Sequence, residues 1–296
     1  MIILSIAVIV VLLFLGLCWW MAGYVMTGKR QTLDEAYAWQ CDHYDTSFYD
    51  PLEKTEYTVT GDGDYTLHVQ FIKNPVPTSK YMIISHGYTD NRMGNLKYMK
   101  MYLDYGFNCI TYDLRGHGKN APTCTTYGIL EAKDLLKVIE DTRKRYPDMT
   151  VLGLHGESLG AATTATVMKY KPQVDFAVAD CGFSDIENVI RGAYVSRKLP
   201  DWLFDIADLG SRMRFHISLK DMRPIDSLPD NKVPILFIHG AEDDFILPQN
   251  SFDMKEATAG YAEVYTIPGA GHAESVLTDT DTYREYVKRF LEKVLQ

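Results

Sequence analysis

A serine lies in a glycine-rich turn between a short apolar run and a helix-like segment. The apolar run VLGL (151–154) is followed by Gly156-Glu157-Ser158-Leu159-Gly160 and then by AATTATVMKY. G-x-S-x-G between a strand and a helix is typical of a strained turn that exposes a nucleophilic serine, and the glycines remove β-carbons that would collide there. The pattern therefore predicts Ser158 as a nucleophile, with the backbone N–H of Leu159 directed at a developing oxyanion.

Suitable partners for this serine follow it in the chain. A serine hydroxyl needs a base to take its proton, and the base needs an acid to orient it. Asp243 follows the apolar run ILFIH, and His272 follows EVYTI, so both occupy loops after predicted strands. The order serine, aspartate, histidine is one of those known for such triads. We predict His272 as the general base and Asp243 as the acid, with the adjacent Asp244 as the alternative acid.

An oxyanion hole requires a second backbone donor beside Leu159. The strand-like run YMIIS ends in Ser85-His86-Gly87-Tyr88. Gly87 allows close approach of the backbone, so the sequence predicts the N–H of Tyr88 as this second donor.

The composition limits the class of protein. The chain has 296 residues, a formal charge of −9 and a sequence pI near 5.4. No basic stripe is present, which argues against a nucleic-acid partner. The five cysteines have neither zinc-site nor C-x-x-C spacing, and the sequence lacks a P-loop motif. We therefore predict no cofactor and no metal.

Eight strand-like runs indicate one α/β domain over residues 55–296. They lie at 55–60, 65–72, 81–85, 108–113, 151–155, 175–180, 235–239 and 263–267. The first two flank Gly61-Asp62-Gly63-Asp64, a hairpin turn signal. The later runs alternate with helical patterns, which predicts a mostly parallel eight-stranded sheet with helices on both faces.

The N-terminus has the composition of a membrane span. Residues 1–27 contain no charged side chain, and Trp19, Trp20 and Tyr24 fall where an aromatic belt would lie. We predict an uncleaved anchor, with a cleaved signal peptide as the alternative. Lys29 and Arg30 after the span favour a cytoplasmic catalytic domain, although two residues leave the membrane side open. Residues 28–54 suit a helical connector.

A long interruption separates the sixth and seventh predicted strands, at about 183–232. It contains apolar residues at mixed spacing, broken by Pro200, Pro224 and Pro229. Because it is much longer than an ordinary connection, we predict a small helical cap over the carboxyl ends of the strands. A surface insertion with no role in the site is the alternative.

Seven motifs in order mark a resemblance to a known group. SHGYTDN, YDLRGHGKN, GILEAKD, HGESLGAAT, VADCGFSD, IHGAEDDFILP and GAGHAES together resemble bacterial α/β-hydrolases of the serine aminopeptidase and prolyl-oligopeptidase-like group, over roughly residues 35–296. The resemblance implies the α/β-hydrolase fold and the same roles for Ser158, Asp243 and His272. Leu159 departs from the Met or Gln frequent at its position.

These observations predict a serine hydrolase that acts through an acyl-enzyme on a small-molecule or peptide acyl substrate. A carboxylesterase for small or medium acyl esters is the main hypothesis. A serine peptidase is the alternative, with Asp185, Glu187 or Asp205 in the cap as a receptor for a substrate amine; solvated surface is the other interpretation of those acids. A non-catalytic binding protein on a hydrolase fold is the second alternative. The physiological substrate and the oligomeric state have no signature in the sequence.

Overall fold

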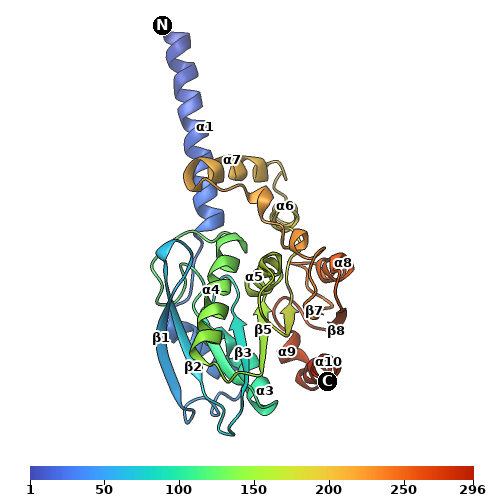
Figure 1. The fold of residues 1–296 in the computed structure, drawn as a ribbon. Helices are drawn as coiled ribbons and strands as arrows, with labels where there is room; N and C mark the ends of the chain where they lie inside the picture. The colour runs from blue at the N-terminus through green and yellow to red at the C-terminus, as the bar shows by residue number, and fades with distance from the viewer.

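The computed structural model describes residues 1–296 and contains one eight-stranded sheet (Figure 1). The strands are β1 (Lys54–Thr60), β2 (Thr66–Ile72), β3 (Lys80–Ser85), β4 (Asn108–Tyr112), β5 (Val151–Glu157), β6 (Phe176–Asp180), β7 (Ile235–Gly240) and β8 (Ala262–Ile267). Their order is β1-β2-β4-β3-β5-β6-β7-β8. β2 pairs antiparallel with β1 and β4, and β4, β3 and β5 to β8 run parallel. All eight predicted runs form strands, so the predicted sheet is confirmed.

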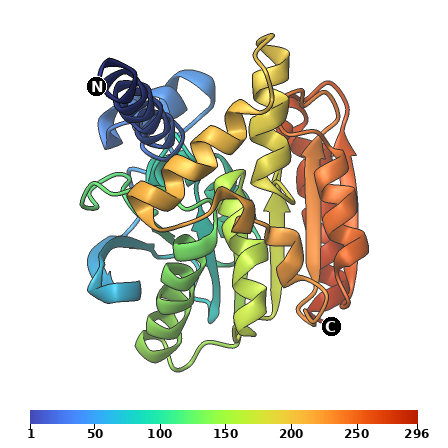
Figure 2. The same ribbon diagram turned by 90° about the horizontal axis from the view of Figure 1, so that it is seen from above.

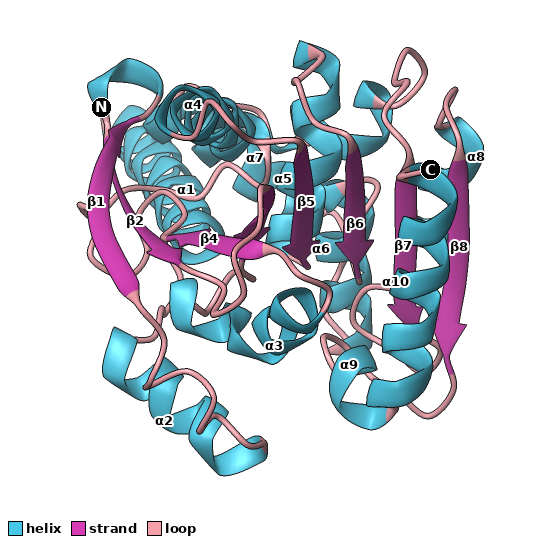
Figure 3. Ribbon diagram, turned by 60° about the horizontal axis from the view of Figure 1, so that its bottom comes forward, coloured by secondary structure: helices cyan, strands magenta, loops and turns pink.

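Helices cover both faces of the sheet (Figure 3). They are α1 (Ile2–Met26), α2 (Leu33–His43), α3 (Leu96–Asp104), α4 (Ile129–Arg145), α5 (Leu159–Val167), α6 (Ile186–Ser196), α7 (Leu203–Phe215), α8 (Gln249–Ala257), α9 (Ser275–Thr278) and α10 (Thr280–Val294). Apolar side chains of α4 and α5 belong to one buried cluster, and those of α3 and α10 belong to a second. The central strands are therefore buried on both faces, as a parallel sheet requires.

The hairpin between β1 and β2 forms at the predicted turn. Asp62–Asp64 makes a single short 3₁₀ turn, and Gly63 adopts a φ of 65°. Glycine populates this left-handed region without the Cβ penalty that other residues meet there.

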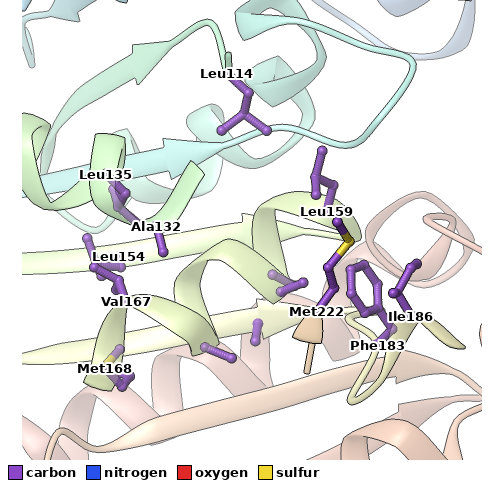
Figure 4. Close-up of a cluster of buried hydrophobic side chains, with 14 of the residues drawn as sticks. Leu114, Ala132, Leu135, Leu154, Leu159, Val167, Met168, Phe183, Ile186 and Met222 are labelled. Carbon is purple, nitrogen blue, oxygen red and sulfur yellow. The ribbon is translucent and has the colours of Figure 1, made fainter. Parts of the chain in front are cut away.

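The interruption between β6 and β7 forms α6 and α7 with short 3₁₀ turns at Leu219–Asp221 and Pro224–Ser227. One cluster of buried side chains joins this insertion to the start of α5 (Figure 4). In that cluster Leu159 lies near Phe183, Ile186 and Met222. The insertion is thus tied by its apolar core to the residue that follows Ser158.

α1 has an exposed part and a docked part. It is the one helix long and apolar enough to cross a membrane, and it projects far beyond the rest of the fold (Figure 1). Its last third packs on α7 and joins the core, through the buried residues Cys18, Met21, Ala22, Val25 and Met26. α1 therefore packs with the insertion that holds α6 and α7, which we call the cap.

Candidate active site

The turn after β5 holds Ser158 in a strained conformation. Its φ of 53° and ψ of −111° lie outside the regions that ordinary residues favour. A Cβ at Gly156 would collide with the carbonyl of Gly160, and one at Gly160 would collide with the carbonyl of Ser85. Only glycines fit these two positions, so the turn presents the serine between β5 and α5 as the motif predicts.

The three predicted triad side chains lie in one hydrogen-bonded chain. Ser158 Oγ lies 3.0 Å from His272 Nε2, and His272 Nδ1 lies 2.7 Å from Asp243 Oδ2. The carboxylate can only accept, so Nδ1–H donates to Asp243 and Nε2 accepts from the serine hydroxyl. The structure thus brings together residues that are far apart in the sequence, in the geometry of an activated nucleophile.

Asp243 is buried and both of its carboxylate oxygens accept hydrogen bonds, whereas the neighbouring Asp244 is exposed. Asp243 Oδ1 accepts the backbone N–H groups of Phe245 and Ile246 at 3.0 and 2.9 Å. Burial raises the pKa of Asp243, but hydrogen bonds from His239 and His272 outweigh burial and hold the pKa well below its usual range. Asp243 is therefore a carboxylate at neutral pH, and it is the acid that contacts His272.

His239, at the end of β7, holds this carboxylate from the other side. Its Nε2 lies 2.7 Å from the carbonyl oxygen of Ile246 and 3.2 Å from Asp243 Oδ2. Since a carbonyl can only accept, Nε2 carries the proton, and Nδ1 accepts from Ser251 Oγ at 2.7 Å. The sequence places His239 at a strand end but gives no sign of this contact with Asp243.

The two predicted oxyanion donors lie on either side of the serine. Leu159 begins α5 directly after Ser158. A methyl group at Gly87 would lie 3.7 Å from Ser158 Cβ, so the loop that carries Tyr88 passes close to the nucleophile. The N–H of Tyr88 has no acceptor within the protein. It is available to a bound ligand.

The Tyr88 side chain contacts the end of α1. Its hydroxyl accepts the N–H of Gly28 at 2.8 Å and donates to the carbonyl oxygen of Val25 at 3.2 Å. The ring of Tyr127 stacks on that of Tyr88, and the Tyr127 hydroxyl donates to the same carbonyl at 2.6 Å. The end of α1 is thus bonded to the loop that carries the free N–H.

A buried ion pair joins the serine turn to the histidine loop. The ammonium group of Lys97, on α3, pairs with Glu157 and donates a 2.9 Å hydrogen bond to the carbonyl oxygen of Ala273. The hydroxyl of Tyr98 bonds to Glu157 at 2.6 Å and to Asp180 at 2.9 Å. Sequence reasoning misses these partners, because α3 carries no motif that links it to the serine.

A polar cavity of about 480 Å³ opens beside His272. Its lining comprises Gln31, Trp39, His43, Thr89, Asp90, Lys97, Glu157, His272, Ala273, Glu274, Leu277 and Thr278. α2 provides one wall, through Trp39 and His43, whose rings stack at 3.8 Å. The segment predicted as a connector thus also shapes the cavity next to the triad.

The cap acids proposed as amine receptors already have cationic partners. Asp185 pairs with Arg223 and Glu187 pairs with Arg191. Asp205 pairs with both Arg191 and Lys220. None of the three carboxylates is left free for a substrate amine.

Comparison with known proteins now identifies the family. A model of the prolyl oligopeptidase family matches residues 94–296. The chain belongs to this family. The group suggested by the seven motifs is thereby confirmed, and the protein is a serine hydrolase.

A relative of known sequence covers most of the chain. The uncharacterized protein YqkD of Bacillus subtilis is 31% identical over an alignment of 252 residues, and the match covers 83% of this chain and 82% of YqkD.

Solved structures share the family fold at low sequence identity. The esterase Pf2001 of Pyrococcus furiosus superposes with a TM-score of 0.70 at 22% identity, covering 83% of this chain and 93% of Pf2001. The esterase Est1E of Butyrivibrio proteoclasticus, with ferulic acid bound, gives 0.64 at 18% identity, over 81% and 99% of the two chains. The acylaminoacyl peptidase of Pyrococcus horikoshii gives 0.64 at 15% identity, over 86% of this chain and 46% of the peptidase. These likenesses confirm the α/β-hydrolase fold.

Proposed function

We propose that this family member is a membrane-anchored carboxylesterase that works through an acyl-enzyme. Ser158 Oγ attacks the ester carbonyl while His272 takes its proton and then gives that proton to the leaving alcohol. Water, activated by the same histidine, releases the acid and restores the serine. Asp243 holds the imidazole in the required tautomer and stabilises its charged form.

The observation that carries this proposal is the hydrogen-bonded chain from Ser158 through His272 to Asp243. Its two links of 3.0 and 2.7 Å lie within the reach that proton transfer requires. The free N–H of Tyr88 and the N–H of Leu159 would stabilise the oxyanion of the tetrahedral intermediate.

Two observations favour ester over peptide substrates. Asp185, Glu187 and Asp205 are neutralised by arginine and lysine, so none of these three cap acids is a free receptor for a peptide amino terminus. Two of the structural neighbours, Pf2001 and Est1E, are esterases by name. We propose small or medium acyl esters as the substrate class.

One carboxylate favours the alternative of a serine peptidase. Asp90 lines the cavity beside His272 and has no cationic partner within ion-pair distance. Burial raises the pKa of Asp90 to about 6, with the neighbouring Glu157 adding to the rise, so the group is largely ionised at neutral pH. A substrate ammonium group near His272 would find its partner here.

We also propose that α1 is retained as a membrane anchor rather than cleaved as a signal peptide. Cys18, Ala22 and Met26 are fully buried against the cap and core. The carbonyl of Val25 bonds to Tyr88 and Tyr127. Cleavage after the apolar segment would remove α1, so that the folded protein would lose these contacts and the side of α7 that faces α1 would become exposed.

Hydrolysis assays on the full chain in detergent micelles test the reaction. p-Nitrophenyl esters of increasing acyl length and aminoacyl p-nitroanilides are compared, with Ser158→Ala as the control. The proposal expects ester turnover that disappears in Ser158→Ala. Anilide turnover that exceeds ester turnover would instead support the peptidase, and Asp90→Asn would then raise its KM.

A further inference from the structure

The part of α1 that is free of the protein on every side is too short to cross a bilayer by itself. Beyond it, only one face of the helix, with Trp19, Trp20 and Tyr24, stays exposed. Every residue from Ile2 to Leu17 except Leu15 is exposed, and burial in the protein begins at Cys18. At 1.5 Å per residue, Ile2–Leu17 rises only about 24 Å. The hydrocarbon core of a bilayer is about 30 Å thick. If α1 spans the membrane, the part of the protein that surrounds its lower end must lie within the membrane boundary.

The element at that level is α7, which crosses α1 (Figure 1). A Cβ at Gly210 would collide with the carbonyl of Cys18, and Arg214 bonds to the carbonyl oxygen of Trp19 at 3.2 Å. Ser211, the residue after Gly210 and about 100° further around α7, contacts Met26 Sδ through its Oγ at 3.0 Å. Gly210 and Arg214 therefore mark the side of α7 that faces the N-terminus of α1, and Ser211 marks the side that faces the sheet.

An apolar stripe runs along α7 on the side away from the sheet. We call it the cap stripe, and it consists of Trp202, Ile206, Leu209 and Met213, spaced four, three and four residues apart. Trp202 is 55% exposed, Leu209 39% and Met213 36%, whereas Ile206 is half-buried and packs against the core cluster. At 100° per residue, the stripe adjoins Gly210 and Arg214 on the flank opposite Ser211. It therefore faces the direction in which α1 leaves the protein.

The end of α6 and the connection to α7 extend this surface; we call this segment, residues 195–199, the α6–α7 turn. Val195 and Leu199 are 61% and 44% exposed, and Arg197 and Lys198 lie between them. Seen along α1, α7 and this turn lie on the near side of the fold (Figure 2). Apolar side chains interleaved with cations suit the boundary between acyl chains and anionic lipid headgroups. The guanidinium of Arg214 lies 5.3 Å from the centroid of the Trp19 ring, at the same level of α1.

We propose that the cap stripe and the α6–α7 turn form a second membrane contact, inserted about 6 Å into the bilayer beside α1. This inference rests on the proposal that α1 is a membrane anchor. The occupant of the surface is lipid, because immersion of the cap supplies the about 6 Å of hydrocarbon thickness that Ile2–Leu17 does not cover. The cap, whose core touches Leu159, would then hold the active site against the membrane surface.

Nitroxide accessibility in the full chain, reconstituted in phosphatidylethanolamine–phosphatidylglycerol nanodiscs, tests this contact. The background is Cys41→Ser, which removes the exposed thiol. Labels are placed one at a time at Met213→Cys on the cap stripe, at its neighbour Arg212→Cys, which faces away from α1, and at Ile9→Cys within α1. The ratio of collision with oxygen to collision with a water-soluble nickel chelate reports immersion in lipid.

We expect a ratio several-fold higher at position 213 than at position 212, and the highest ratio at position 9. A water-like ratio at 213 with a lipid-like ratio at 9 would overturn the inference and leave the anchor standing. A water-like ratio at 9 would overturn both. Protection of 213 from both reagents would mean that protein, not lipid, covers the stripe, and would also overturn the inference.

Discussion

The ammonium group of Lys97 donates a 2.9 Å hydrogen bond to the carbonyl oxygen of Ala273, the residue after His272. The same group pairs with Glu157, the residue before Ser158. Its side chain is 5% exposed, and that of Glu157 is 9% exposed. One buried cation thus fixes the loop of the proposed base relative to the turn of the proposed nucleophile.

Lys97→Met should lower kcat by about 100-fold with little change in KM. Without this side chain, the Ser158 turn and the His272 loop are no longer bonded to one common group, and small misplacements of catalytic groups lower the rate strongly. The substitution should also destabilise the fold by about 3–5 kcal/mol, since the buried Glu157 carboxylate loses its cationic partner. Lys100→Met, on the exposed side of α3, is the matched control. Ester kinetics below the unfolding temperature of each variant provide the measurement.

The double variant Lys97→Met, Glu157→Gln separates positioning from stability. Removing both charges should recover most of the unfolding temperature, because no uncompensated charge remains. The kcat should stay low, because the bond to Ala273 is still missing. Recovery of kcat together with stability would show that Lys97 acts on the fold alone.

Asp243→Asn should reduce kcat by about 10⁴-fold, because an amide at this position favours the wrong tautomer of His272. Asp244→Asn should leave kcat nearly unchanged, since Asp244 is exposed and does not contact the histidine. Steady-state ester hydrolysis by the two variants decides between the adjacent acids. A larger loss in Asp244→Asn would contradict the assignment.

Asp180 should make the stability depend on pH in an identifiable window. Burial raises its pKa to about 6, and the nearby Glu157 adds to the rise. An unfolded aspartate titrates near 3.9, so between about pH 4 and 6 the folded protein holds more protons than the unfolded chain. The contribution of Asp180 to the free energy of unfolding must therefore fall as the pH rises through this window.

Asp180→Asn removes that titration while keeping an acceptor for the Tyr98 hydroxyl. The stability of the variant relative to the wild type should increase from about pH 4 to about pH 6 and then level off. Thermal unfolding of both proteins in micelles across the window measures the difference. A pH-independent difference would show that Asp180 does not titrate there.

Gly210→Ala tests the docking of α1 on α7. The added methyl group would collide with the backbone carbonyl of Cys18, so the two helices must separate, at a cost of about 1–3 kcal/mol. Gly192→Ala, on α6, is the control, because a Cβ there meets no atom within 4 Å. It should stabilise the protein by about 0.5–1 kcal/mol. Equal unfolding temperatures for the two variants would contradict the packing.

The sequence predicts the sheet, which the structure confirms, and it predicts the three residues of the proposed triad, which the structure brings together, because both have local signatures. Each strand is an apolar run, and the runs VLGLH, ILFIH and EVYTI each lead directly into a loop that carries one of Ser158, Asp243 and His272. Parallel strands bring their carboxyl ends to one edge of the sheet, so three local patterns suffice to predict a tertiary site.

Contacts between residues that are far apart in the chain cannot be predicted from such local sequence patterns. From the sequence, Lys97 would be taken for an ordinary residue on a helix surface. Only the folded structure shows it between Glu157 and Ala273. The sequence predicts only a connector for α2, but in the structure its residues Trp39 and His43 line the cavity. The apolar composition of α1 predicts a membrane span but does not indicate that its last third packs on α7.

Mass spectrometry of the full chain after treatment with a fluorophosphonate tests the central claim most directly. The probe reacts only with a serine that is activated as a nucleophile. We predict a single adduct on the peptide that contains Ser158, at least 10³-fold slower formation in His272→Ala, and none in Ser158→Ala. Folded wild-type protein that forms no adduct, or that is labelled on another residue, would contradict the proposed active site.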